Sequence, residues 1–191
     1  DWSGAAAALS RATELSPDDL GLALALASAT VKAGEVDRAL VAAERLIELD
    51  PQLTGAHELR ADLLLAEGRA GEAAAAVEHS RTLGVVTASL EVTAGKATLE
   101  LGDASGALAA FEAAIALDRG SADALAGKAL ASLQLGESSG AAVAVEELRR
   151  VEPEHPLLQS LEAALISVGG GDSGTTAGEA VTDDEDSELE R

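Results

Sequence analysis

The fold is decided by residues 20–53, which read LGLALALASATVKAGEVDRALVAAERLIELDPQL. The Ala- and Leu-rich run from Leu22 to Ala33 stops at Gly34, a residue that tolerates the left-handed conformation closing a helix. Between Asp37 and Leu49, one buried helical face is predicted by the spacing of Leu40, Ala43, Leu46 and Ile47. The stretch therefore predicts two helices joined at Gly34.

The end of this stretch predicts where the next helix begins. Asp50 is a candidate N-cap, and Pro51 suits the first turn of a helix. Ser16–Asp19 is expected to do the same one period earlier, with Asp19 placed like the acid of a capping box.

The helix pair recurs every 34 residues. One column is always glycine, at Gly34, Gly68, Gly102 and Gly136. A second column is always alanine, at Ala5, Ala39, Ala73, Ala107 and Ala141. A fixed period of this length is typical of solenoid repeats. The alanine column is expected where the second helix presses on the first, so that a larger side chain would push the pair apart.

With Leu20 as repeat position one, the pattern resembles the tetratricopeptide repeat (TPR) family. Small residues occupy position eight, glycine occupies position fifteen, and alanine occupies position twenty. Apolar residues occupy position twenty-four, and proline occupies position thirty-two at Pro17, Pro51 and Pro153. Val85 and Arg119 depart from the proline column, and position eleven, usually large, is Thr or Ser in three repeats. The resemblance implies an all-α, right-handed superhelical solenoid of helix pairs.

The register divides the chain into a solenoid over residues 1–168 and a tail over 169–191. Residues 1–19 are the second half of a truncated repeat, which suggests a fragment of a longer protein or a processed N-terminus. The full repeats are 20–53, 54–87, 88–121 and 122–155, and 156–168 is expected to be a capping helix. The tail runs from Gly169 through the acidic run Asp183–Asp186, and its composition predicts disorder.

Composition excludes several classes of function. The net charge of −21 argues against nucleic-acid binding, which needs concentrated Lys and Arg. The chain has no Cys, and its most apolar stretch, residues 21–31, is well short of the ~20 residues of a membrane helix. Residues that are encoded by AT-rich codons are scarce in the chain, which indicates a GC-rich prokaryotic source. The compartment stays open, with the cytoplasm slightly favoured.

No motif predicts catalysis, a cofactor or a metal. Residues 136–140 match a G-x-S-x-G nucleophile pattern, but they fall in a helix-to-helix turn rather than a strand-to-helix elbow. Residues 169–174 match a dinucleotide fingerprint by letters only, since no strand precedes them. His57, His79 and His155 lack metal-ligand spacing and are expected to be ordinary surface histidines. We therefore expect no enzyme.

The resemblance implies that the first helices of the repeats line a concave groove for a partner. The candidate partner-binding residues on those helices are Leu24, Ser28, Val31, Glu58, Asp62, Leu65, Val92, Lys96, Leu99, Leu130 and Leu133. Co-chaperone members of the family clamp a C-terminal carboxylate with Lys and Asn at positions where this chain has Leu24, Ser28 and Leu59. Chaperone-tail binding is therefore disfavoured.

Val31, Leu65, Leu99 and Leu133 share position twelve and form an apolar row. If exposed, the row would suit an apolar or amphipathic helix. Alternatively, the small residues at position eleven allow a slight helix rotation that buries the row.

The sequence thus predicts a non-catalytic scaffold that binds a peptide or helix of a partner protein in the groove. Two alternatives remain: a regulatory or docking segment of a larger protein, in which an enzyme domain could precede Asp1, and a self-assembling homo-oligomer.

Overall fold

The computed structural model describes residues 1–169, and within that range it contains ten α-helices and no strand. The predicted disorder of the acidic tail lies outside the described residues. The helices are α1 (Trp2–Leu15), α2 (Leu20–Ala33), α3 (Val36–Leu49), α4 (Thr54–Ala66), α5 (Ala70–Thr82), α6 (Ala88–Glu100), α7 (Ala104–Leu117), α8 (Ala122–Gln134), α9 (Ser138–Val151) and α10 (Leu158–Gly169).

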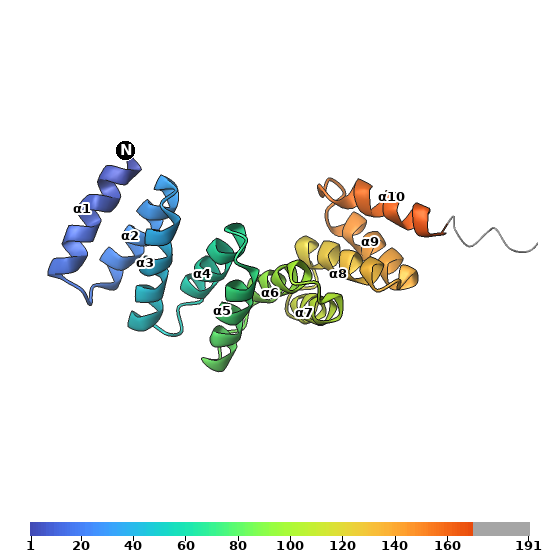
Figure 1. The fold of residues 1–191 in the computed structure, drawn as a ribbon, viewed down its shortest axis with the longest axis horizontal. Coiled ribbons are helices and arrows are strands. Elements are labelled where there is room, and N and C mark those ends of the chain that lie inside the picture. The colour runs from blue at the N-terminus through green and yellow to red at the C-terminus, as the bar shows by residue number, and fades with distance from the viewer. Residues whose placement is uncertain (170–191) are drawn as a thin grey trace, which may run out of the picture.

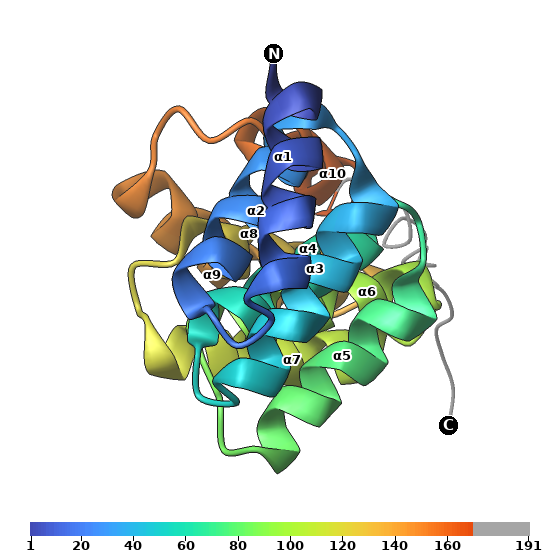
Figure 2. The ribbon, with the colours of Figure 1, turned by 90° about the vertical axis from the view of Figure 1, so that its left-hand side faces the viewer.

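The helices stack in chain order along one axis, with α1 at one end and α10 at the other (Figure 1). Each helix packs on the next, and α2–α3, α4–α5, α6–α7 and α8–α9 are the paired helices of the repeat. The view along the axis shows the pairs superimposed behind α1 (Figure 2). The predicted all-α solenoid is confirmed.

The first helices lie on the inner side of the array. α4 packs on α6, α6 packs on α8 and α8 packs on α10, although another helix lies between the members of each pair in the sequence. Among residues 1–169, α3, α5, α7 and α9 do not pack on one another in this way. We call the side formed by α2, α4, α6 and α8 the inner surface.

The glycine column ends the first helices as predicted. Gly34, Gly68, Gly102 and Gly136 all have positive φ, between 71° and 82°. A side chain would be strained there whatever the surrounding space. The turns at these glycines set the antiparallel geometry of each pair.

The predicted caps need two corrections. Asp19 is itself the N-cap of α2, since its Oδ1 accepts a hydrogen bond from the Leu22 amide at 3.0 Å. Asp50 does not cap α4, because it ends α3 and accepts from the Gln52 amide within the turn. α4 begins three residues later than Pro51, with no side-chain cap.

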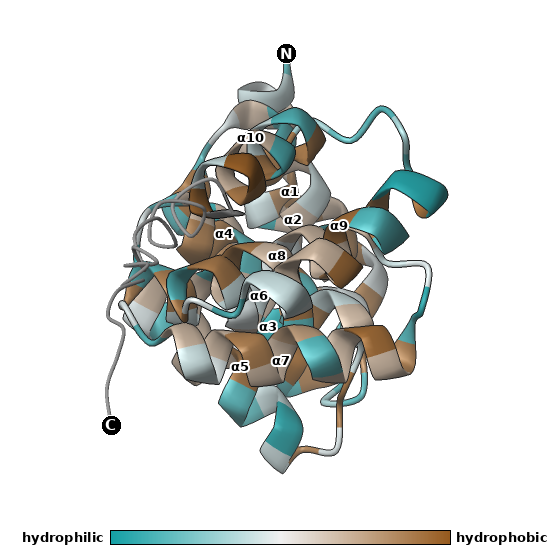
Figure 3. Cartoon of the chain, turned by 90° about the vertical axis from the view of Figure 1, so that its right-hand side faces the viewer, coloured by the Kyte–Doolittle hydropathy of each residue, from teal (hydrophilic) through white to brown (hydrophobic). Residues whose placement is uncertain are grey.

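The core consists of small residues and a few large ones. The predicted face of α3 is buried, and the alanine column is fully buried at Ala39, Ala73, Ala107 and Ala141. Ala5 is only partly buried, because residues 1–169 contain no first helix that belongs to the same repeat as α1. Viewed from the α10 end, hydrophobic residues run through the packed helices (Figure 3).

Candidate functional site

The predicted partner-binding residues differ in how much of each side chain faces solvent. Leu24, Ser28, Val31, Asp62 and Lys96 are exposed. Glu58, Leu65, Leu99, Leu130 and Leu133 are partly buried, and Val92 is buried and leaves little for a partner to touch. The inner surface is therefore most open at α2.

The exposed face of α2 is apolar or small along its whole length. Leu24 and Val31 are 44% and 42% exposed, and Gly21, Ala25 and Ser28 lie on the same face at helical spacing. α4 does not pack on α2, although α6 packs on α4 and α8 on α6. The face is thus left uncovered because α4 does not pack on it.

A cation lies at the end of this face. Lys32 extends over the ring of Trp2, with Nζ 4.4 Å from the ring centroid. Within residues 1–169, Lys32 forms no ion pair with a carboxylate. A cation held over an aromatic face keeps its charge available to a further acidic group.

The charged residues of the inner surface farther along are already bonded to the next first helix. Thr87 Oγ1 donates to Glu58 Oε1, and Thr93 Oγ1 donates to Asp62 Oδ1, both at 2.7 Å. These two bonds join α4 to α6. A partner there would have to compete with them.

The same arrangement joins α6 to α8. Lys96 Nζ lies 2.9 Å from Asp123 Oδ2, and His155 Nε2 lies 3.5 Å from Asp123 Oδ1. The hydrogen bond from Lys96 lowers the pKa of Asp123, and partial burial opposes this shift. Sequence reasoning missed Asp123, Thr93 and His155, because their partners lie about 30 residues away along the chain.

The helices are not rotated as the alternative for the apolar row required. Position eleven stays buried at Thr30, Leu64 and Ser132. Thr30 satisfies its hydroxyl within its own helix by donating to the Leu26 and Ala27 carbonyls at 2.9 Å. Ser132 Oγ is buried and has no hydrogen-bond partner among residues 1–169. Position twelve is partly buried in three repeats and exposed only at Val31.

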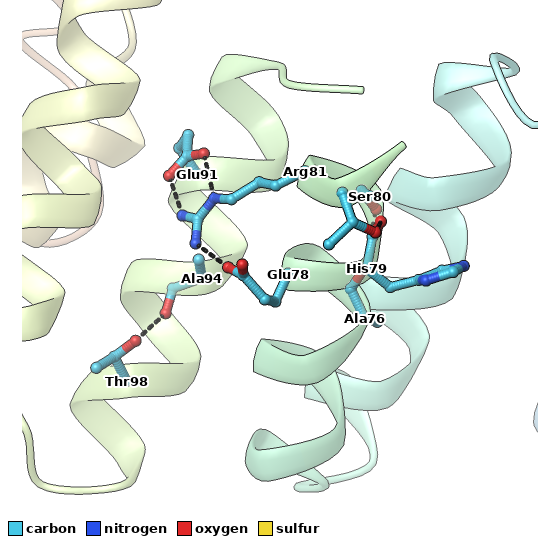
Figure 4. Close-up of polar contacts among 9 residues, drawn as sticks. Ala76, Glu78, His79, Ser80, Arg81, Glu91, Ala94 and Thr98 are labelled. Carbon is cyan, nitrogen blue, oxygen red and sulfur yellow. Dashed lines mark hydrogen bonds and ion pairs between the residues drawn. The ribbon is translucent and has the colours of Figure 1, made fainter. Parts of the chain in front are cut away.

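Two buried polar contacts inside the array have no counterpart in the sequence analysis. The first is an ion pair between α5 and α6, in which the Arg81 guanidinium holds the buried Glu91 carboxylate and also Glu78 (Figure 4). Hydrogen bonding to Glu91 raises the pKa of Arg81 above its usual range. This contact holds two consecutive repeats together.

The second buried contact joins His57 and Ser80. His57 Nδ1 lies 2.9 Å from Ser80 Oγ, and Nε2 lies 3.0 Å from the Pro51 carbonyl oxygen. His57 and His155 are buried, so the expectation of surface histidines is wrong for two of the three; only His79 is exposed. They are buried because each fills a space between helices and bonds there.

No catalytic or metal arrangement was found among the described residues. The nucleophile-like motif was expected in the turn between α8 and α9; Gly136 lies in that turn, but Ser138 is already the first residue of α9. No group of three or more His, Asp or Glu within residues 1–169 is placed to hold a metal ion. None of the ten helices is long and apolar enough to cross a membrane. The dinucleotide-like letters lie almost wholly outside the described residues.

Two pockets lie at the second helices, and the sequence did not predict them. One, of about 410 Å³, is lined by α3, α4 and α5 and by Arg69, which immediately precedes α5. The other, of about 370 Å³, is lined by α1, α2 and α3 and includes Leu26. Val41 lines both. These pockets are a second surface that a partner could use.

Comparison with solved structures finds the same architecture in other proteins. YrrB, described as "a TPR protein with an unusual peptide-binding site", is 18% identical, with 88% of this chain and 87% of that chain covered and a TM-score of 0.70. A tetratricopeptide repeat protein from Parabacteroides merdae is 18% identical, with 89% and 68% covered and a TM-score of 0.72. MamA from Desulfovibrio magneticus is 15% identical, with 81% and 88% covered and a TM-score of 0.68.

At these identities the likeness concerns the fold alone, and no curated protein matches the chain in sequence. Family models described as tetratricopeptide repeat match residues 1–54, 24–79 and 98–165. The matches together cover well over half of the sequence, and the positions of glycine and alanine follow the same register. The chain belongs to the tetratricopeptide repeat family.

Proposed function

We propose that the chain is a non-catalytic scaffold that holds a peptide or helix of a partner protein on its inner surface. The supporting observation is the uncovered face of α2, where Leu24 and Val31 are exposed without an adjacent first helix. An exposed apolar face on an otherwise acidic protein is typical of a binding surface. Stacked repeats present such faces as an extended groove.

The chemistry of this face suggests the kind of segment it takes. Leu24 and Val31 are seven residues apart, so they lie two turns apart on one side of α2. An amphipathic helix could lay its apolar side along them. A carboxylate on that helix could then approach Lys32, which has no acidic partner within residues 1–169.

The test is peptide selection followed by calorimetry. Peptides selected from a random display library on the immobilised chain would be titrated against the native protein and a Leu24→Arg/Val31→Arg variant. The control is Val41→Arg/Val143→Arg, with the same change in charge at two exposed residues of α3 and α9. Circular dichroism must show that all three proteins are equally folded.

The proposal expects at least a tenfold loss of affinity in the α2 variant and less than a twofold change in the control. The opposite pattern would place the site at the second helices, because Val41 lines both pockets there. If neither variant changes the affinity, the inner surface at α2 is not the binding site.

A further inference from the structure

The first complete repeat is joined to the second differently from the way in which the later repeats are joined. α4 packs on α6, α6 on α8 and α8 on α10, but α2 does not pack on α4. Of the first helix pair, only α3 packs on a helix of the second pair within residues 1–169, and Figure 1 shows α3 between α2 and α4. This step lies inside the array, between two complete helix pairs, and we call it the open step.

Position nine of a first helix faces the next first helix where α4, α6 and α8 pack on one another. Asp62, at position nine of α4, accepts a hydrogen bond from Thr93 of α6 at 2.7 Å. Lys96, at position nine of α6, lies 2.9 Å from Asp123 of α8. Thr93 and Asp123 are at positions six and two of their repeats, so these are the positions that meet position nine.

The contact between α8 and α10 uses the same positions without polar side chains. Leu130, at position nine of α8, packs against an apolar cluster that contains Leu161, at position six of α10. Leu157, at position two, immediately precedes α10. Two first helices can therefore pack through apolar side chains at these positions.

At the open step, the corresponding residues are small or apolar. Ser28 is at position nine of α2, and Leu59 and Gly55 are at positions six and two of α4. Leu24, at position five, lies one turn before Ser28 on the same side of α2. Among the described residues no hydrogen bond or ion pair joins α2 to α4, so their spacing can change without breaking a polar contact.

Burial shows which surfaces the open step leaves uncovered. Position six is buried in the three helices that pack on a preceding first helix, at Thr93, Gly127 and Leu161. Leu59, at position six of α4, is only partly buried. Leu24 is 44% exposed, although position five is buried in α6 and α8. α2 and α4 thus leave partly in solvent the sides with which the later first helices pack on one another.

We propose that the open step is a hinge, and that the unit of α1, α2 and α3 swings about the contact between α3 and α4 until α2 packs on α4. Closure brings Ser28 and Leu24 against Leu59 and Gly55, as the equivalent residues meet in the later steps. α1 moves with α2 because the two helices pack on one another. The structure shows the open state, and the packing of the later first helices gives the geometry of the closed state.

Closure regulates the binding face on α2, and this part of the proposal rests on the proposed function. Leu24 and Val31, the exposed apolar residues of that face, are at positions five and twelve. Both positions are less exposed in the repeats whose first helices pack on one another. A partner on α2 and closure onto α4 therefore exclude each other. A segment that binds the face holds the step open, and a substitution that favours closure weakens binding by the same linkage.

Closure is measured first without any partner, as the distance between two spin labels in electron paramagnetic resonance. The chain has no cysteine, so labels attach only at introduced residues. Arg11, His79 and Glu147 share position twenty-six on α1, α5 and α9, and all three are exposed. The pair Arg11→Cys/His79→Cys spans the hinge. The pair His79→Cys/Glu147→Cys spans two steps whose first helices are packed and is the reference.

Gly55→Leu is the variant that favours closure, because it copies Leu157 at position two. Gly71→Leu is the matched control: each glycine is the second residue of its helix, and no side chain or neighbouring element within residues 1–169 lies within 4 Å of either Cβ position. Ser28→Leu, which copies Leu130 at position nine, is a second closing variant.

The native chain is expected mainly at one distance across the hinge, that of the open state. Both closing variants should enrich the same second distance by about fivefold or more, whereas the Gly71→Leu control should not. The reference pair should keep a single distance in every protein. A single, unchanged distance across the hinge in the native chain and in both closing variants would overturn the proposal.

Regulation is measured by calorimetry with the peptide selected on the native chain. If Gly55→Leu raises the closed population to about nine-tenths, the apparent affinity falls about tenfold, because only the open fraction binds. The Gly71→Leu control should stay within about twofold of the native affinity. Saturating peptide should remove the second distance from the closing variants. If the second distance persists with peptide bound, the hinge stands and its regulatory role is overturned. If instead the peptide does not depend on Leu24 and Val31, the proposed function fails while the label distances still decide closure.

Discussion

Gly127 on α8 provides the space for the ring of Phe111 on α7, because a Cβ atom at residue 127 would lie 2.2 Å from Phe111 Cε1. Gly95 on α6 lies against the same ring, with a Cβ distance of 2.7 Å. The single phenylalanine of the chain is therefore seated between two glycines on two consecutive first helices.

Gly127→Ala should destabilise the fold by about 1–3 kcal/mol through overpacking, although alanine is otherwise favoured over glycine in a helix. In a Phe111→Val background, which copies Val77 and Val145 at the same repeat position, the substitution should instead be neutral or stabilising. Urea unfolding of the native protein, the two single variants and the double variant gives the coupling free energy between residues 111 and 127. Gly55→Ala is the control, because no side chain or neighbouring element within residues 1–169 lies within 4 Å of its Cβ position. Equal effects of Gly127→Ala in both backgrounds would contradict the packing argument.

The ion pair of Arg81 and Glu91 should contribute much more to the stability of the fold than the ion pair of Arg69 and Glu72. The Glu91 side chain is 4% exposed, whereas Glu72, the partner of Arg69, is 61% exposed. Removing one member of a fully buried pair costs about 3–5 kcal/mol, and the loss here should lie below that range because Arg81 itself is 37% exposed. An exposed pair is worth about 0–1 kcal/mol.

We therefore expect Arg81→Ala to lower the free energy of unfolding by several times the effect of Arg69→Ala. Chemical denaturation measures both. Glu91→Leu in the Arg81→Ala protein should recover much of the loss, because Leu125 occupies the same repeat position in the last complete pair. Similar losses for the two arginine variants would mean that Glu91 is solvated despite its burial.

The repeat register was predictable because it depends on residues within one helix pair. Gly34 and its equivalents have positive φ wherever the period places them, and Leu46 and Ile47 are buried as the helical spacing predicts. These features follow from local backbone preference and from apolar spacing, which the linear sequence contains. Asp50 failed as a cap because the chain uses it to end α3 before Pro51.

The candidate site was less predictable because it depends on contacts between repeats. Asp62 and Lys96 have the same repeat position, yet one accepts from Thr93 and the other pairs with Asp123. The lack of packing between α2 and α4 also has no signal in the sequence. The side chains that meet in the candidate site lie about 30 residues apart in the sequence, and they come together only after the helices have stacked.

Asp123 should make a measurable contribution to the pH dependence of stability. Its pKa is lowered in the folded state, mainly by the hydrogen bond from Lys96. Stability from such a group is present above the unfolded pKa of about 3.9 and is lost as the pH falls through the lower folded value. Since the side chain is 59% exposed, the contribution should be less than about 1 kcal/mol.

Native protein should therefore be more stable than Asp123→Asn at neutral pH, and the difference should disappear in strong acid. Urea unfolding of both proteins at neutral pH and below pH ~3 measures this. Glu100→Gln, at an exposed residue without an ion pair in residues 1–169, controls for the loss of one charge. A difference that persists in acid would show that Asp123 acts through packing rather than charge.

The buried contact between His57 and Ser80 should be a point where the second repeat is easily destabilised. His57 Nε2 lies 3.0 Å from the Pro51 carbonyl oxygen, and the Ser80 hydroxyl lies 2.9 Å from both His57 Nδ1 and the Ala76 carbonyl oxygen. Ser80→Ala removes the hydrogen-bond partner of Nδ1 and should cost about 1–3 kcal/mol, because a buried polar atom is left unpaired. Ser160→Ala, which removes an exposed hydroxyl bonded to the Leu157 carbonyl, should cost much less.

Leu125 and Leu148 occupy the same two repeat positions as His57 and Ser80 and are both fully buried, so an apolar pair fits this site. His57→Leu should therefore be less harmful in the Ser80→Ala protein than in the native one, and additive effects in thermal unfolding would show that the two side chains act independently.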